Sequence, residues 1–356
     1  MPHERTLSDA LTSIIPVSAE AAAEADERQS QLTKPRGSMG ALEILGSRLC
    51  AVSRTCPPPV PARPAVAVFA GDHGVHAQGV TPWPQEVTVQ MVANFAAGGA
   101  VVNALARQVG ATVAVVDVGL ATEPVPAGAL RRANVARATA DLSLGPAMTR
   151  EQALAAIEVG LAVADELVDS GADLLVTGDM GIANTTPAAA LVALSTGAEP
   201  ELVTGRGTGV DDAMLAVKTA VVTAVVDRVR SRSEAADAVD LLAEAGGFEH
   251  AALAGFLLGG AVRRVPVVVD GVIAASGALV AAALAPDAVG YWVAGHLSPD
   301  PGAALALESL GLTPLLDLDL RLGEGSGALL AVPLVQSAAR ILAEVATFDS
   351  AGVADK

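Results

Sequence analysis

One acidic side chain in the sequence stands among three glycines, in the stretch Arg321 to Gly327 (RLGEGSG). Glycine lets the backbone approach a ligand closely, and the carboxylate of Glu324 in such a loop is a candidate general base. The apolar run Pro314 to Leu320 before it predicts a strand, and the run Ala328 to Leu342 after it predicts a helix. We therefore expect Glu324 at a strand-to-helix junction, where open α/β sheets bind their ligands.

Two other interpretations compete for this stretch. Residues 323–328 (GEGSGA) formally match the Gly-x-Gly-x-x-Ala dinucleotide fingerprint. The sequence ends soon after the next helix, however, so the second strand and its ribose-binding acid cannot follow. An acid between glycines can also do no more than stabilise the positive end of a helix. Spacing alone leaves a general base and a helix-start charge both open.

Two further glycine-rich turns are candidate anion sites. Residues 178–187 (GDMGIANTTP) join a predicted strand to a helix whose cap is Asn184 or Thr185, and the free N–H groups of a helix start bind anions. Residues 205–209 (GRGTG) form the second turn, in which Arg206 could hold a phosphate. No Walker lysine pattern is present, which favours a phosphate that is gripped by backbone and not transferred. An ordinary capped turn and a flexible loop stay open as alternatives.

Polar and aromatic residues after the first predicted strand form another group. Asp72, His73 and His76 could bind a metal, but the chain has five histidines and no His-Glu-x-x-His helix, so we prefer a polar cluster that shapes the site. Trp83 stands between two prolines and could stack on a flat ligand or anchor the core. Lys34 could reach an active site from its Pro-Arg-Gly-Ser turn or stay solvated.

Short apolar runs alternate with long helical ones along most of the chain. The predicted strands are Ala65–Ala70, Thr112–Val118, Asp173–Thr177, Val265–Asp270, Tyr291–Ala294 and Pro314–Leu318. The predicted helices include one capped by Ser18, then Ala41–Val52, Pro84–Arg107, Thr149–Ser170, Asp211–Val229 and Pro301–Leu310. This alternation predicts right-handed crossovers and a parallel sheet. The loops after the strands are rich in Gly, Asp and His, and all converge on the carboxyl edge of such a sheet.

Composition excludes several classes of protein. The net charge is −17 and no cluster of Lys and Arg stands out, so nucleic-acid binding is disfavoured and an anionic ligand needs local devices such as helix N-termini. The longest uncharged apolar stretch, Gly271 to Pro286, is too short for a bilayer helix. The first residues, Met1 to Arg5, are unlike a secretion signal, and Cys50 and Cys56 suggest two reduced thiols. We expect a cytoplasmic protein with no membrane segment.

Six motifs taken together carry a resemblance to a known family. They are residues 32–38 (LTKPRGS), 71–75 (GDHGV), 178–190 (GDMGIANTTPAAA), 246–249 (GGFE), 270–271 (DG) and 321–328 (RLGEGSGA). In this order, and over nearly the whole chain, they resemble the nicotinate-nucleotide:dimethylbenzimidazole phosphoribosyltransferases of cobalamin synthesis.

The resemblance implies a reaction. Ribose 5-phosphate would move from nicotinate mononucleotide to 5,6-dimethylbenzimidazole, giving α-ribazole 5′-phosphate and nicotinate, with Glu324 as general base. The pyridinium leaving group departs as a neutral nitrogen, and no pyrophosphate leaves, so neither a metal nor a cofactor is expected. Two alternatives remain: the same chemistry with another acceptor such as adenine or a phenol, and a non-catalytic nucleotide-binding protein.

The resemblance also implies site residues and architecture. The catalytic residue is Glu324, and the substrate-binding residues are Trp83, Met91, Asp179, Met180, Gly181, Asn184, Gly205, Arg206, Gly207, Arg321, Leu322 and Gly323. Asp179 stands where many relatives have Glu, and the positions of Trp83 and Met91 vary among relatives. The implied fold is α/β: a mostly parallel, six-stranded Rossmann-like sheet flanked by helices (residues 61–328), with a smaller helical domain from both chain ends (1–60 and 329–356). The implied assembly is a homodimer.

Overall fold

The computed structural model describes residues 5–124, 130–232 and 236–354, so Met1 to Glu4, used above to predict localisation, lie outside the described residues. Within the described residues, six parallel strands form one sheet in the order β3-β2-β1-β4-β5-β6. The strands are β1 (Pro64–Gly71), β2 (Thr112–Gly119), β3 (Leu130–Arg132), β4 (Leu174–Met180), β5 (Val267–Val269) and β6 (Trp292–Ala294). Strand order reverses between β1 and β4, as in the Rossmann-like sheet that the sequence predicts.

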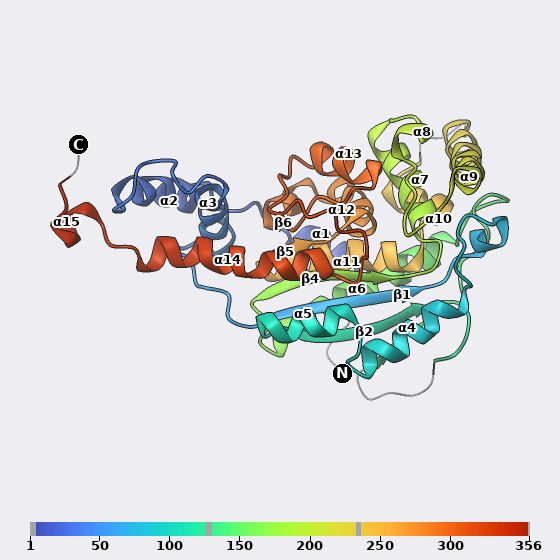
Figure 1. Cartoon of the computed structure of the whole chain (residues 1–356), viewed down its shortest axis with the longest axis horizontal. Helices are drawn as coiled ribbons and strands as arrows, with labels where there is room; N and C mark the ends of the chain where they lie inside the picture. Colours follow the sequence, from blue (N-terminus) through green and yellow to red (C-terminus); the bar gives the residue numbers. More distant parts are fainter. Residues whose placement is uncertain (1–4, 125–129, 233–235, 355–356) are drawn as a thin grey trace.

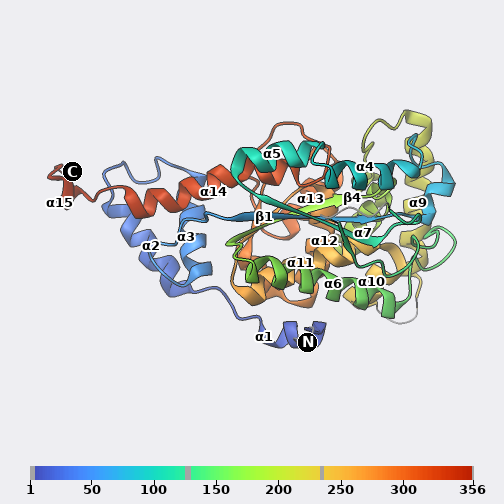
Figure 2. The same cartoon turned by 90° about the horizontal axis from the view of Figure 1, so that it is seen from below.

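Helices cover both faces of the sheet (Figures 1 and 2). One face carries α4 (Glu86–Ala96), α5 (Val101–Val109) and α14 (Ser326–Glu344). The other face carries α6 (Arg150–Asp169), α10 (Ala238–Ala245), α11 (Phe248–Arg263) and α12 (Val272–Leu284). Around the carboxyl edge lie η1 (Gly74–Gln78), α7 (Thr185–Thr196), α8 (Pro200–Val203), α9 (Asp212–Arg230) and α13 (Pro301–Ser309). The short η2 (Pro286–Tyr291) leads into the start of β6 and contacts α3 and α12.

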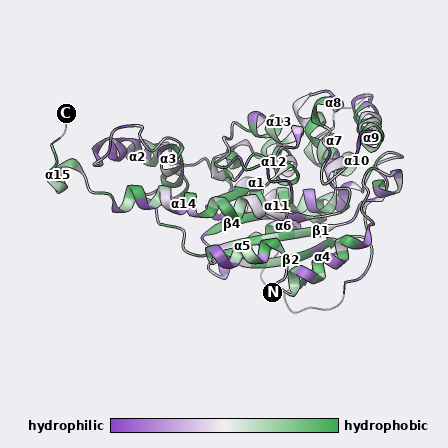
Figure 3. Ribbon diagram, in the orientation of Figure 1, coloured by the Kyte–Doolittle hydropathy of each residue, from purple (hydrophilic) through white to green (hydrophobic). Residues whose placement is uncertain are grey.

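The core is divided by the sheet into two layers of small apolar side chains. Along β1, the side chains of Ala65, Ala67 and Phe69 pack into one layer, and those of Val66 and Val68 pack into the other. This alternation follows from the two-residue period of a strand, and burial on both faces explains why β1 is apolar throughout. Figure 3 shows the same distribution, with apolar residues gathered on the strands and on the helices against them.

The two chain ends meet at one end of the molecule. There α2 (Ala19–Gln31) and α3 (Ala41–Ser53) pack against each other and against α14, and α15 (Phe348–Ala351) follows (Figure 1). The Ser18 side chain caps α2, as predicted, by accepting from the Ala21 N–H. An isolated bridge joins Leu32 to Thr347. These contacts suit a small helical domain from both chain ends, but the division at residues 60 and 328 stays a prediction.

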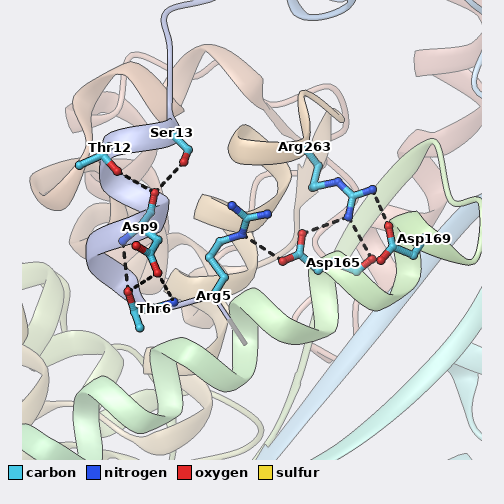
Figure 4. Close-up of polar contacts among 8 residues, drawn as sticks. All are labelled: Arg5, Thr6, Asp9, Thr12, Ser13, Asp165, Asp169 and Arg263. Atoms are coloured by element: carbon cyan, nitrogen blue, oxygen red, sulfur yellow. Dashed lines mark hydrogen bonds and ion pairs between the residues drawn. The ribbon is translucent and has the colours of Figure 1, made fainter. Parts of the chain in front are cut away.

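The first helix, α1 (Leu7–Ser13), lies instead against α6 and α11. Arg5 donates to Asp165 at 3.0 Å, and Arg263 donates to the other oxygen of Asp165 at 3.1 Å and to Asp169 at 2.7 Å (Figure 4). Two arginines thus share one carboxylate, which ties the N-terminal segment to both helices.

The sixth predicted strand, Pro314–Leu318, is wrong. The segment makes only one parallel bridge, between Leu316 and His296. Leu318 is 55% exposed and Asp319 has a φ of 56°, so the chain turns away from the edge of the sheet after this bridge. The strand that completes the sheet is β3, whose Leu-Arg-Arg sequence at the opposite edge gives no apolar run.

The single helix predicted over Pro84–Arg107 is also wrong, because the structure has two helices. α4 ends at Ala96 and α5 begins at Val101, and Gly98 between them has a φ of 78°. This conformation interrupts the hydrogen-bond ladder of a helix and is one that glycine adopts readily. The break matters because it creates a second helix N-terminus, next to the pocket described below.

Two segments are long and apolar enough to cross a membrane, namely Glu86–Val109 and Ser326–Glu344. The first is interrupted between α4 and α5, and the second is α14, which packs on the sheet and on α3. Core helices of globular proteins pass the same test, so these segments are weak grounds for a membrane assignment.

Candidate active site

The site lies at the switch point of the sheet, where the neighbours β1 and β4 send their connections to opposite faces. β1 ends at Gly71 and β4 ends at Met180. A pocket of about 890 Å³ opens beside the end of β4, and its walls come from loops that follow β1, β4, β5 and β6. Open α/β sheets bind ligands at this point because the diverging connections leave a crevice.

All of the predicted catalytic and substrate-binding residues line this pocket. They are Trp83, Met91, Asp179, Met180, Gly181, Asn184, Gly205, Arg206, Gly207, Arg321, Leu322, Gly323 and Glu324. They come from four separate segments of the chain, so the sheet has brought them together. Their individual roles stay predictions.

Glu324 lies at the start of α14 with an unusual backbone. Its φ is 64°, between Gly323 at 81° and Gly325 at 89°, so three successive residues are left-handed. Its side chain is 4% exposed, and its Oε2 accepts from the Val102 N–H of α5 at 3.1 Å. Among the described residues, the other carboxylate oxygen accepts no hydrogen bond. One oxygen is therefore anchored by a helix N-terminus, and the other is available to the pocket.

The environment raises the pKa of Glu324 above its ordinary value of 4.5. Burial is the largest cause, because it disfavours the charged form. The N–H of Val102 acts in the opposite direction, and the nearby charge of Asp270 raises the pKa further. A buried carboxylate with a raised pKa accepts a proton more readily than an exposed one, which suits a general base.

Asp179 is the second acid in the pocket. It is 5% exposed, its Oδ2 accepts from Asn184 Nδ2 at 3.0 Å, and its main-chain oxygen accepts from the Glu324 N–H at 3.2 Å. Burial, and then the charge of Asp270, raise the pKa of Asp179 well above its ordinary range. Burial therefore disfavours the charged form of the Asp179 side chain, while its backbone supports the loop of Glu324.

The second glycine-rich turn forms the far wall of the pocket. A Cβ on Gly205 would lie 2.2 Å from Asp300 Oδ2, so only glycine fits there. Arg206, the predicted phosphate ligand, pairs with Asp212 and donates to the Val210 main-chain oxygen at 3.1 Å. The Arg206 guanidinium therefore binds groups of its own turn and of the start of α9 in this structure.

Lys218 is a site residue that the sequence analysis missed. Its Nζ donates to Thr185 Oγ1 and to the Gly205 main-chain oxygen, both at 2.8 Å, and the residue is fully buried. Burial lowers the pKa of Lys218 to about 8, against the opposing effect of Asp300. A cationic lysine at neutral pH thus links the glycine turn to the start of α7. The sequence signal was weak, since this lysine stands in an ordinary helical run.

The N-terminus of α7 lies at the same part of the pocket as the glycine-rich turn. Gly181, Asn184 and Thr185 line the pocket around the first turn of this 12-residue helix. Unpaired N–H groups and the helix dipole favour a bound anion there. With Lys218 beside it, the α7 end of the pocket is the part best suited to a phosphate in an otherwise acidic chain.

Another part of the pocket wall is apolar. Val87 and Met91 of α4 contribute to it, and Trp83 is 47% exposed, so the tryptophan is not a core anchor. The Trp83 indole N–H donates to the Thr208 main-chain oxygen at 3.1 Å, which holds the ring across the pocket mouth. An exposed ring fixed in this way can stack on an aromatic ligand.

A buried polar cluster supports the floor of the site. His73 Nε2 lies 2.7 Å and His250 Nδ1 lies 2.9 Å from the same oxygen of Glu249, and all three side chains are fully buried. A tetrahedral zinc site separates its ligand atoms by about 3.3 Å. The distances here are shorter, and His73 Nε2 shares a hydrogen bond with Glu249. A polar cluster in place of a metal site stays a prediction for His73. His73 lies next to Gly181, where a Cβ would be 3.2 Å from its Nε2.

The fold and this pocket place the chain among the doubly wound α/β proteins that bind a small ligand at the switch point of their sheet. A family model described as "Phosphoribosyltransferase" matches residues 14–353. The nicotinate-nucleotide–dimethylbenzimidazole phosphoribosyltransferase of Salinispora tropica is 59% identical over 370 residues, which cover all of both chains. That of Chloroflexus aggregans is 51% identical over 350 residues, 98% of each chain.

A solved structure agrees with these sequences. The crystal structure of the phosphoribosyltransferase of this name from Thermus thermophilus superimposes with a TM-score of 0.90 at 44% identity, covering 95% of this chain and 100% of that one. The chain belongs to the nicotinate-nucleotide:dimethylbenzimidazole phosphoribosyltransferase family, as its motifs indicated.

Proposed function

We propose that the protein transfers ribose 5-phosphate from nicotinate mononucleotide to 5,6-dimethylbenzimidazole, with Glu324 as the general base. The observation that carries the role of Glu324 is its geometry. The carboxylate is buried at the edge of the pocket, one oxygen is held by the Val102 N–H, and the other has no hydrogen-bond partner among the described residues. A base must be fixed and desolvated while one lone pair stays available to its substrate.

The chemistry requires one proton acceptor. One ring nitrogen of the benzimidazole attacks C1′ of the ribose, and the bond between C1′ and the pyridinium nitrogen breaks. The electron pair of that bond returns to nicotinate, which leaves as a neutral pyridine and needs no proton. The benzimidazole loses the proton on its other ring nitrogen, and Glu324 accepts it. Attack opposite the departing ring converts a β linkage to an α linkage.

The two ends of the pocket suit the two substrates. The phosphate of the nucleotide fits the end formed by α7 and the Gly205–Gly207 turn, where N–H groups are available. The buried Lys218 lies behind this turn and supports it through Thr185 and the Gly205 main-chain oxygen. The acceptor base fits the apolar side formed by Trp83 and Met91. Because no pyrophosphate leaves, the reaction does not require Mg²⁺ to neutralise a leaving group.

We also propose that the enzyme is a cytoplasmic homodimer, as the family resemblance implies. Light scattering on the purified protein is expected to give twice the mass of the chain. A monomer at assay concentrations would contradict this assembly without affecting the proposed reaction.

The proposed reaction is tested by incubating the purified protein with nicotinate mononucleotide and 5,6-dimethylbenzimidazole in the presence of EDTA. Mass spectrometry is expected to detect α-ribazole 5′-phosphate and nicotinate in equal amounts. Adenine and a phenol added in competition show which acceptor is preferred. Tight binding of nicotinate mononucleotide without nicotinate release, for every acceptor, would instead support a binding protein.

A further inference from the structure

The loop that carries Glu324 cannot hold its shape by local preference. Three successive residues, Gly323, Glu324 and Gly325, have φ values of 81°, 64° and 89°. Glycine adopts such angles readily, but glutamate rarely does. A conformation of this kind persists only where the surrounding structure fixes it. Some group outside the loop must therefore hold it.

Besides the Asp179 main-chain oxygen, which accepts from the Glu324 N–H, Asp270 is such a group. Its Oδ2 accepts from the Gly325 N–H at 3.2 Å, and its Oδ1 accepts from the Ala328 N–H at 2.8 Å. The two N–H groups lie at the start of α14, directly after Glu324, where the helix itself provides no acceptors. One carboxylate thus satisfies two helix-start donors and fixes the turn on the C-terminal side of Glu324.

Asp270 is itself fixed to the sheet. It follows β5, is 2% exposed, and donates its own N–H to Thr177 Oγ1 of β4 at 2.9 Å. The Thr177 hydroxyl in turn donates to the Val268 main-chain oxygen at 3.2 Å. His296, after β6, places its Nε2 3.5 Å from Asp270 Oδ1. The carboxylate therefore connects three neighbouring strands to the start of α14.

We propose that Asp270 is a positioning residue that holds the Glu324 carboxylate in the pocket and acts on it through its charge. This inference rests on the proposed role of Glu324 as general base. Asp270 does not line the pocket, so it acts on the substrates only through Glu324.

The charges around Glu324 define what Asp270 contributes. Asp270 faces it from the β5 loop and Asp179 from the end of β4, while α5 presents the Val102 N–H. His296 of the β6 loop faces Asp270. Of these groups, Asp270 is the charge that raises the pKa of Glu324. Removing this charge lowers the pKa of Glu324 and moves the acid limb of kcat to lower pH.

The test is Asp270→Asn, assayed for kcat, KM and the pH dependence of kcat. Asparagine has nearly the shape of aspartate but only one oxygen that can accept. Its NH₂ group would face one of the two helix-start N–H donors, so one of the two hydrogen bonds is lost and the turn is held less firmly. We expect kcat to fall on the order of 10- to 100-fold, KM for nicotinate mononucleotide to change little, and the acid limb to move to lower pH.

A matched control is Asp173→Asn. Asp173 makes the same pair of bonds, with the N–H groups of Ala62 at 2.9 Å and Arg63 at 2.7 Å, but it lies at the opposite end of β4. Loss of this pair is expected to lower the thermal midpoint while kcat and its pH profile stay as in the wild type. If Asp270→Asn also lowers the thermal midpoint while kcat and its pH profile stay as in the wild type, the inference is wrong.

A second variant covers the case in which Asp270→Asn does not fold. Thr177→Val loosens Asp270 without removing its charge. We therefore expect kcat to fall several-fold while the acid limb of its pH profile does not move; unchanged kcat would contradict the inference.

Glu324→Gln in the same assay separates the proposed role of Asp270 from the proposed general base. If it is inactive while Asp270→Asn is normal, Asp270 alone loses its role. If it is fully active, the general base itself is wrong.

Discussion

At the scale of residues, the site depends on keeping Glu324 ionised in a buried place. Two features oppose each other there. Burial and the charge of Asp270 favour the protonated acid, and the N–H of Val102 at the start of α5 favours the carboxylate. The result is a carboxylate that is more basic than an exposed one and yet is held in one orientation.

This balance predicts the pH dependence of the wild-type enzyme. Glu324 must be ionised to accept a proton, and its pKa is raised above 4.5. We therefore expect kcat to be constant at neutral pH and to fall as the pH decreases through the raised pKa. The profile is measured at saturating substrates, where kcat reports groups in the enzyme–substrate complex. A flat profile down to the ordinary pKa of glutamate would contradict this environment.

A second residue-scale prediction concerns Lys218. Because it is buried between Thr185 and Gly205, its replacement by methionine removes the cation and two hydrogen bonds from the predicted phosphate end. We expect Lys218→Met to raise KM for nicotinate mononucleotide about tenfold.

Nicotinate riboside, which lacks the phosphate, is the control substrate. Its weaker turnover should change little in Lys218→Met if the lysine serves the phosphate. An equal loss with both substrates would show that Lys218 only supports the fold.

The sequence was informative about residues where glycines and acids follow predicted strands. Asp179 and Gly181 could be placed at the pocket because loops after parallel strands share an edge of the sheet. Glu324 lies there although the strand predicted before it does not form, so its placement was predictable only from the family motif. Lys218 could not be found in this way, since nothing local distinguishes a buried lysine in a helix from an exposed one. Its partners, Thr185 and Gly205, are 33 and 13 residues away in the chain.

At the scale of elements, close backbone contact between α6 and α11 supports the sheet face opposite α14. A Cβ on Gly160 would lie 1.9 Å from the Ala252 main-chain oxygen, and a Cβ on Gly255 would lie 1.9 Å from that of Ile157. The two helices therefore touch at a reciprocal pair of glycines. Neither position can accept a side chain unless the helices move apart.

Gly160→Ala is accordingly expected to destabilise the protein by about 3 kcal/mol, the upper range for overpacking a core. Gly145→Ala is the control, because a Cβ there meets nothing within 4 Å. Thermal unfolding of both variants checks the prediction. Equal midpoints for the two would mean that α6 and α11 adjust without cost.

Elements were predictable where a periodic pattern was long. The helix predicted over Thr149–Ser170 is α6, which begins one residue later, at Arg150, with Thr149 as its cap. Short edge elements were not predictable, because β3 consists of Leu130 and two arginines that pair only with β2. The apolar run from Pro314 has the composition of a strand, yet its pairing with the sheet is a single bridge between Leu316 and His296. Pairing at an edge depends on tertiary position more than on composition.

At the scale of the whole molecule, the sheet separates the pocket from the helices of the chain ends. The strands run from the end that holds α2 and α3 toward the end that holds α7 and α9 (Figure 1). The fold was predictable because alternating strands and helices allow few topologies. The proposed homodimer stays a prediction from the family resemblance, since an assembly depends on surfaces whose partners the chain does not contain.

The central claim is that this pocket transfers a phosphoribosyl group with Glu324 as its base. The most direct measurement is the rate at which wild-type protein and Glu324→Gln form α-ribazole 5′-phosphate, with circular dichroism and thermal unfolding showing that both are folded. We predict that Glu324→Gln loses about 100-fold or more in kcat. A folded Glu324→Gln protein with the wild-type rate would contradict the account.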